Sequence, residues 1–286
     1  MITALVLVVI SLVLVGPGPY LVKRWRWLHQ VPRAAIVLWQ AGAVAALVAV
    51  IGAGVSVLRH LPDVVHPVRL AVSAVVLIFV GHVVVRLLWF GIRELARSGS
   101  RRRRHRDLVD LLARSEEGRT GSRHYVVSGA EPVAYCLPGF FSSSRVVVSS
   151  GALDTLAEDE FDAVLAHEQS HLRARHDIVL DTFAALHRAF PVGVRSELPL
   201  QQARVLVEMM ADDNAVRQVG SLPLVRAMAA LSPGPAPEAA LGLGGALAPR
   251  LDRLTSRSAN RRLLALLTYA MALSLLAVPV AVLLVG

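Results

Sequence analysis

The sequence predicts an α-helical membrane protein that carries a mixed α+β domain between its third and fourth membrane spans. Of the 286 residues, 55% are hydrophobic and only 18% are charged, and the mean hydropathy is +0.55. A soluble domain usually has about a quarter charged residues. The apolar residues lie in long uninterrupted runs, whereas the segment between the last two runs has the composition of a globular domain.

Four runs are long and apolar enough to cross a bilayer core of about 30 Å. They cover Ile2 to about Val22, about Ala34 to Leu58, about Val68 to Phe90, and Leu263 to about Val285. The first run contains a Gly16-Pro17-Gly18-Pro19 break near its end. We expect it to be a permanent helix and not a cleaved signal peptide, because it has no basic leader and no small-x-small cleavage site.

The basic residues predict the orientation in the membrane. Lys23, Arg24, Arg26 and Arg33 follow the first span, and a run of arginines from Arg93 to Arg106 follows the third. By the positive-inside rule, both termini lie outside and the segment 93–262 lies in the cytosol. The net charge of +9 is concentrated beside the spans, so the lipid bilayer is the expected partner and direct nucleic-acid binding is not expected.

The predicted domain organisation has three parts. Residues 1–95 form a three-helix transmembrane region, residues 96–262 a cytosolic domain, and residues 263–286 the fourth transmembrane helix. The periodicity within the middle part predicts short strands, helices and one loop. The strands are expected at 124–127, 133–137 and 145–149, the helices at 107–114, 160–186 and 198–219, and the loop at 232–245. The run Arg101–Arg106 is expected to be solvated beside anionic headgroups.

One motif in the middle part indicates metal chemistry. His167-Glu168-Gln169-Ser170-His171 fits the pattern H-E-x-x-H within a predicted helix. Residues four apart lie on one face of a helix, so the two imidazoles can bind one ion. Glu168 lies one step round the helix, where it can act as a general base on water at the metal. The motif therefore predicts a zincin-like hydrolytic site that binds Zn²⁺.

A third ligand is expected from the second long helix. A catalytic zinc ion usually has three protein ligands and one open position. Glu208 and Asp212 interrupt an otherwise apolar stretch of that helix, and a buried carboxylate needs a partner. We predict Glu208 as the third ligand. Asp212, one turn further on, is predicted to accept the free N–H of a zinc-bound histidine.

These residues resemble the gluzincin membrane peptidases, which include the HtpX-type, CAAX-prenyl-type and BlaR/MecR-type families. The stretch RVVVSSGALDTLAEDEFDAVLA, followed by HEQSHLRARHD and later by EMMAD, is most similar to the BlaR/MecR-type family. The resemblance implies a bacterial inner-membrane protein whose zinc is held by His167, His171 and Glu208. It also implies that Glu168 is the catalytic base and that Asp212 orients a ligand.

The function predicted from this resemblance is a regulatory zinc endopeptidase that cleaves a cytosolic protein, such as a BlaI/MecI-type transcriptional repressor. One alternative is an HtpX-like quality-control protease, and another is a non-catalytic zinc-binding receptor. The antibiotic-sensing members carry an extracellular penicillin-binding domain, which is not expected here. Its S-x-x-K motif needs a lysine, and Lys23 is the only lysine.

Some smaller expectations concern the substrate and the residues around it. An extended substrate is expected along an edge strand of the sheet, and the strand Val133–Leu137 is the candidate. Tyr125, Tyr135 and His187 are candidate donors to the oxyanion. Cys136, the single cysteine, is expected to be a small buried residue and not a ligand.

Overall fold

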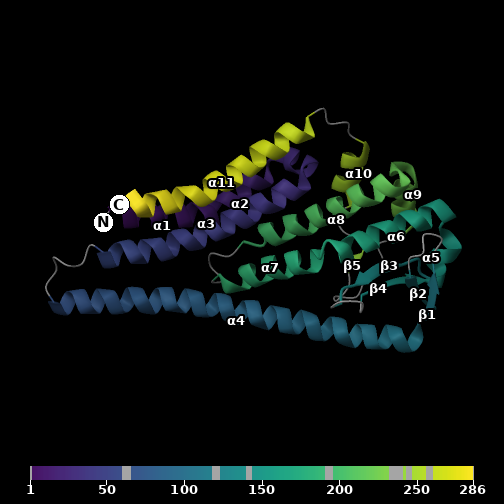
Figure 1. The fold of residues 1–286 in the computed structure, drawn as a ribbon, viewed down its shortest axis with the longest axis horizontal. Coiled ribbons are helices and arrows are strands. Elements are labelled where there is room, and N and C mark those ends of the chain that lie inside the picture. The colour runs from purple at the N-terminus through teal and green to yellow at the C-terminus, as the bar shows by residue number, and fades with distance from the viewer. Residues whose placement is uncertain are drawn as a thin grey trace. The chain divides into compact units, whose positions relative to one another are not determined.

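The structure is a computed structural model, mostly helical with one small mixed sheet (Figure 1). It describes residues 2–59, 66–117, 123–139, 144–190, 196–231, 241–242, 247–255 and 260–285. The chain divides into two compact units. The first contains Met1–Arg93, Thr182–Ala203 and Asn260–Gly286, and the second contains Glu94–Asp181 and Arg204–Ala259.

The apolar helices of the first unit differ from the prediction at the N-terminus. The unit contains α1 (Ile2–Val15), α2 (Pro17–Lys23), the 3-10 helix η1 (Arg26–Gln30), α3 (Pro32–Arg59), the start of α4 (His66–Leu112), and α11 (Arg261–Val285). Among the described residues, α3, α4 and α11 are each long and apolar enough to cross a membrane. The predicted first span is instead a pair of helices, α1 and α2, bent by 46°. Proline cannot donate a backbone hydrogen bond, which explains a break at Pro17.

Small residues on α3 allow the membrane helices to pack closely. α1 and α11 both lie along α3 (Figure 1). Ala49 and Ala53 of α3 form a buried cluster with Leu7 of α1, and Leu283 of α11 packs against this cluster. Helices in lipid gain little from the hydrophobic effect, so close approach over small side chains is their main source of attraction.

Helix α4 continues without a break from His66 to Leu112, well past the predicted end of the third span at Phe90. The prediction of a separate helix at 107–114 is therefore wrong. No proline lies between Phe90 and Leu112, and arginine and leucine are good helix formers. The run Arg101–Arg106 is not wholly solvated either. Arg102 forms ion pairs with Asp177 at 3.2 Å and Asp181 at 3.0 Å, and Arg106 donates a hydrogen bond to the carbonyl oxygen of Pro138.

The second unit contains a five-stranded sheet with the order β1-β2-β4-β3-β5. The strands are β1 (Arg114–Glu117), β2 (Arg123–Val127), β3 (Ala134–Leu137), β4 (Arg145–Ser149) and β5 (Leu241–Gly242). β2 and β4 are parallel, and the other neighbours are antiparallel. The three predicted strands are confirmed to within one residue. β5 lies inside the segment 232–245 that was predicted as a loop; the remaining residues of that segment lie outside the described part.

Alternate residues of the two central strands face opposite layers. Cys136 and Val146 pack in the core that includes Val164 of helix α6 (Glu158–Arg173). Tyr135 and the neighbouring odd-numbered positions pack on the other face, in a core that includes Val109 of α4. All four residues of β3 are therefore buried. This alternation points the thiol of Cys136 towards α6, which carries the H-E-x-x-H motif.

The helix predicted at 160–186 is two helices, α6 and α7 (His176–Ala189). The break falls at Arg175, whose φ of 50° is in the left-handed region. This conformation costs about 1–2 kcal/mol for a residue other than glycine. The guanidinium of Arg175 binds Asp177 through two nitrogens, at 3.1 and 3.0 Å, and donates to the Gly139 carbonyl oxygen at 2.8 Å. These charge-assisted bonds offset the strain, and no glycine or proline marks the break in the sequence.

The remaining helices of the unit complete the support of the motif helix. They are α5 (Ser150–Thr155), α8 (Leu198–Val219, whose first residues belong to the first unit), α9 (Ser221–Ala230) and α10 (Leu247–Thr255). The predicted bounds of α8 are confirmed, and Gly220 follows it with a φ of 88°. α9 and α10 contribute Leu224 and Leu251 to the core beneath α6.

We predict that Gly151→Ala destabilises the second unit, because the backbone there approaches a neighbouring loop. A Cβ atom on Gly151 would lie 2.2 Å from the carbonyl oxygen of Ala130. Overpacking of this kind costs about 1–3 kcal/mol, so the Tm in detergent should fall by several degrees. Gly129→Ala is the control, since its Cβ would lie 3.9 Å from the nearest atom, the Cβ of Ser149. Equal Tm values for the two variants would contradict the close approach.

Candidate metal centre

Two helices bring the predicted metal ligands together. On α6, the carboxylate of Glu160 accepts a hydrogen bond from the backbone N–H of Ala157 at 3.0 Å, which satisfies one donor at the helix start. His167 and His171 lie one turn apart on its buried face. On α8, Glu208 faces them, and α8 is joined to α6 by a hydrogen bond of 2.6 Å from Asn214 to Ser170. All three predicted ligands are buried.

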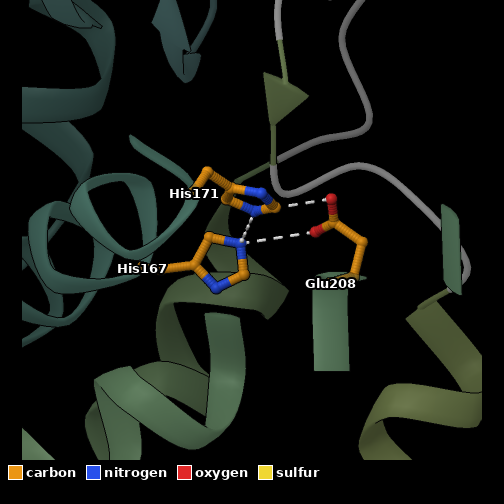
Figure 2. A group of neighbouring side chains, drawn as sticks. All are labelled: His167, His171 and Glu208. Atoms are coloured by element: carbon orange, nitrogen blue, oxygen red, sulfur yellow. Dashed lines mark hydrogen bonds and ion pairs between the residues drawn. The ribbon is translucent and has the colours of Figure 1, made fainter. Parts of the chain in front are cut away.

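Three side-chain atoms converge on one point (Figure 2). The Nε2 atoms of His167 and His171 are 3.2 Å apart, and they lie 3.3 and 3.5 Å from the two carboxylate oxygens of Glu208. The three ligand atoms lie within 4.8 Å of one another. Two imidazole nitrogens and one carboxylate oxygen are a donor set that zinc prefers at catalytic sites, with a fourth position left open. The residues therefore fit a divalent zinc ion.

The other ring nitrogen of His167 meets Asp212. The Nδ1 atom lies 3.0 Å from a carboxylate oxygen of Asp212. A histidine that binds metal through Nε2 carries its proton on Nδ1, so Asp212 is placed to accept that proton in a hydrogen bond. The sequence prediction put Asp212 in this neighbourhood, and the structure brings it to the back of His167.

His176 holds the corresponding position behind His171, and sequence reasoning missed it. The two Nδ1 atoms are 3.0 Å apart, and both rings are fully buried. With Nε2 of His171 turned to the metal position, its Nδ1 donates and Nδ1 of His176 accepts. In a continuous helix, His176 would lie about 140° round from His171. The break at Arg175 turns His176 towards His171. Because the sequence gives no sign of that break, it also gave no signal that His176 belongs to the site.

Glu168 is buried beside the cluster and faces the sheet. Neither of its carboxylate oxygens makes a hydrogen bond of ordinary geometry to the described residues. The thiol of Cys136, a weak donor, is its neighbour on β3, and burial raises the pKa of this thiol well above its ordinary value. Burial also raises the pKa of Glu168 to about 8. A cation in the cluster would favour the ionised form.

Arg250 on α10 is a further member of the centre that sequence reasoning missed. Its guanidinium is fully buried and makes two bonds to Asp212, at 2.9 and 2.6 Å, and one contact of 3.2 Å to Glu208. The available signal was indirect, because two carboxylates in an apolar helix require a cation somewhere. With Glu168, Glu208 and Asp212 ionised and both histidine ligands neutral, the centre including Arg250 has a net charge of two negative units, which one Zn²⁺ ion neutralises.

The charges also explain the pKa values of the ligands. Burial alone would lower the pKa of His167, but the hydrogen bonds that its ring donates to Asp212 and Glu208 outweigh burial and raise the pKa to about 9. Burial lowers the pKa of His171 to about 3. Burial would raise the pKa of Glu208, yet His171, His167 and Arg250 together lower it. His171 is thus neutral and Glu208 ionised near neutral pH, which are the forms that bind metal, whereas His167 has to release a proton when metal binds.

Two of the three candidate oxyanion donors lie on the face of the sheet opposite to the cluster. The hydroxyl of Tyr135 bonds to His105 at 2.9 Å on the opposite face of the sheet, and Tyr125 lies under the guanidinium of Arg145. His187 lies in the first unit, where its ring contacts the backbone oxygen of Ser196. Neither tyrosine is therefore an oxyanion donor in this arrangement, and the role of His187 stays a prediction. The prediction that β3 offers a free edge is also wrong, because β5 pairs with Tyr135 and Cys136.

Comparison with known proteins connects this geometry to one enzyme class. Residues 96–231 match the model of peptidase family M48. Among similar curated proteins, a protease HtpX homolog of Leptothrix cholodnii is 37% identical over 79 residues, which are 27% of each chain. A protease HtpX homolog of Acidiphilium cryptum is 34% identical over 92 residues (32% of this chain, 31% of that protein), and one of Sulfurovum sp. is 33% identical over 61 residues (21% and 22%). No solved structure gives a significant match.

These matches support a membrane zinc metallopeptidase and, with the apolar helices, an inner-membrane protein. The matched segments span less than a third of the length of each relative. They do not support the narrower resemblance to the BlaR/MecR-type family, whereas an HtpX-like protein fits at least as well.

We predict that His176→Phe weakens zinc binding by about 10- to 100-fold, because it removes the acceptor behind His171. The metal-free protein would be titrated with zinc against a chelator of known affinity. His124→Phe is the matched control, since His124 is also buried but packs edge-on against the ring of Phe161. His176→Asn, which keeps an acceptor, should recover part of the affinity. Unchanged affinity in His176→Phe would remove His176 from the centre.

We predict that Arg250→Met destabilises the metal-free protein far more than Arg253→Met does. Both arginines lie on α10, but Arg250 neutralises two buried carboxylates, whereas Arg253 pairs at 2.7 Å with the partly exposed Asp213. Removing one partner of a buried pair costs about 3–5 kcal/mol. Arg253 is itself buried, but Asp213 still contacts water when Arg253 is removed, so the loss of stability should be smaller. Thermal unfolding in the presence of chelator measures both. Similar losses in the two variants would contradict the role of Arg250.

Proposed function

We propose that this protein is an integral membrane zinc endopeptidase whose active site is the cluster of His167, His171 and Glu208. The observation that carries the proposal is the convergence of two Nε2 atoms and a carboxylate within 4.8 Å, beside the buried carboxylate of Glu168. A merely structural zinc site has four protein ligands. Three ligands with an adjacent unengaged carboxylate are the arrangement of a hydrolytic site.

The chemistry would be the addition of water to a peptide carbonyl. Bound zinc supplies a Lewis acid that activates water and polarises the carbonyl. Glu168 takes the proton from the attacking water and then delivers it to the nitrogen of the leaving amine as the C–N bond breaks. Asp212 and His176 hold the two imidazoles in the tautomer that directs Nε2 to the metal. Arg250 keeps Asp212 ionised in the buried centre, and it acts together with His171 and His167 to keep Glu208 ionised.

The proposed substrate is a protein or peptide bound in an extended form. Such a chain gains backbone hydrogen bonds by adding to a sheet edge. The edge of β3 next to Cys136 is paired with β5 of the same chain, and His167, Glu168 and His171 are fully buried. A substrate strand that uses β3 therefore has to displace β5. We propose that the closed arrangement is a resting form of the enzyme.

The substrate class and the orientation are narrower proposals. The similar HtpX homologs favour an HtpX-like protease over a repressor-cleaving one. Only the sequence motifs support a BlaI/MecI-type repressor as the substrate. The arginine-rich segments beside the spans support a catalytic domain at 96–262 in the cytosol, between the third and fourth spans, with both termini outside.

The test of the proposed function compares zinc content with cleavage in the full-length protein. Glu168→Gln should retain stoichiometric zinc and lose cleavage of an unfolded protein substrate by on the order of 100-fold or more. Glu208→Gln should lose both. Glu131→Gln is the control, because Glu131 is an exposed carboxylate of the same domain. Zinc content is measured by atomic absorption and cleavage by gel electrophoresis. Full cleavage by Glu168→Gln would refute the proposed mechanism.

A further inference from the structure

The first unit contains a large, partly open apolar cavity that plays no part in the proposed peptidase chemistry. Its volume is about 1040 Å³, and its walls come from α1, α2, η1, α3, α11 and the segment around the end of α7 and the start of α8. Sites for small molecules usually measure about 300–1,000 Å³. The cavity is thus as large as a site for a sizeable ligand, and it lies among the helices that are apolar enough to span a membrane.

The shape of the cavity fits a long hydrocarbon chain. On α11 the lining positions run from Leu264 to Val278 and recur at three- and four-residue steps through Leu267, Met271 and Ser274. At 1.5 Å per residue, this face is about 21 Å long. One leaflet of the bilayer core is about 15 Å deep, so the cavity is long enough for an acyl chain that reaches across one leaflet. Nearly all the lining side chains are aliphatic or aromatic. An occupant that spans this length and leaves no polar group unsatisfied is an acyl chain.

Two segments that contain glycine, one on α2 and one on α3, leave room for the cavity. The axis of α2 is bent by 46° from the axis of α1, and Gly18 and Pro19 of α2 line the cavity. Gly42 of α3 also lines it, and a Cβ atom built on Gly42 would meet no other atom within 4 Å. The space is therefore open directly beside the α3 backbone.

Positive charge gathers at one end of the cavity. Val22, Trp25 and Trp27 line this end, and the two tryptophan rings are stacked with their centroids 6.2 Å apart. Lys23 and Arg24 lie between them in the chain and are exposed. Arg33, Arg261 and Arg262, which begin α3 and α11, are exposed as well. Among the described residues of this unit the acidic side chain is Glu197, which lies 3.9 Å from His187.

We propose that this cavity is a binding site for one anionic glycerophospholipid, with its acyl chains among α1, α3 and α11 and its phosphate beside Lys23 and Arg24. Tryptophan is typical of the membrane interface, so the stacked pair marks the depth of the glycerol region. Basic residues at that depth attract anionic headgroups. The apolar cavity and the cationic end together select a charged lipid over a neutral one. The proposal does not depend on the peptidase activity.

The experiment uses full-length protein that has been delipidated in detergent. The protein is incubated with equal amounts of phosphatidylglycerol and phosphatidylcholine that carry the same acyl chains, and retained lipid is counted by native mass spectrometry. Wild type should retain one phosphatidylglycerol in preference to phosphatidylcholine by about tenfold or more, given two nearby cations. The double variant Lys23→Gln and Arg24→Gln should retain lipid without this preference.

Two cavity-filling variants test where the lipid lies. Gly42→Phe and Ser274→Phe should each lose the retained lipid, because their rings occupy the cavity. Gly81→Phe is the matched control and should retain it, since Gly81 on α4 also has open space around it but does not line the cavity. If Gly42→Phe does not remain monodisperse, the lipid retention of Ser274→Phe alone tests whether the lipid lies in the cavity. Wild-type retention in both filling variants, or equal retention of the two lipids by wild type, would overturn the proposal.

Discussion

The second unit depends on the burial of two carboxylates, Glu208 and Asp212, one turn apart on α8. Ionised carboxylates are costly to remove from water unless charges and hydrogen bonds compensate them. Here Arg250 contacts both of them, and the two metal-site histidines approach from α6. α6, α8 and α10 are thus held together around a polar centre within an apolar core. In the metal-free centre His167 and Glu168 hold protons near neutral pH, since their pKa values are about 9 and about 8. A bound dication replaces these protons, so metal binding is coupled to pH and to the stability of this unit.

The local chemistry of the sequence was sufficient to predict the parts of the site that follow a fixed spacing. His167, Glu168 and His171 lie on one helix, and the four-residue period places both imidazoles on one face. Glu208 and Asp212 were recognisable because charged residues are out of place in an apolar stretch. The central strands were predicted to within one residue, because valine-rich alternation is a strong local signal.

The features that the sequence did not reveal depend on distant contacts. The break at Arg175 is stabilised by Asp177 and the Gly139 backbone, and no neighbouring glycine or proline in the sequence predicts it. His176 enters the centre only because of that break. β5 pairs two residues across a separation of more than a hundred positions along the chain, and short strands of this kind carry little pattern. Helix α4 continues where a span was expected to end, because the aqueous and apolar parts of one helix have the same backbone geometry.

The centre also has a built-in reporter. Cys136 is the chain's single cysteine, fully buried on β3 with its thiol against the carboxylate of Glu168. An alkylating reagent can reach this sulfur only when the strand and the motif helix separate, so the modification rate counts those opening events, in the way that amide hydrogen exchange counts local unfolding. Since no second thiol competes, a single mass increment reports the opening of this one place in the fold. The rate of Cys136 alkylation therefore measures how often the metal centre opens to solvent.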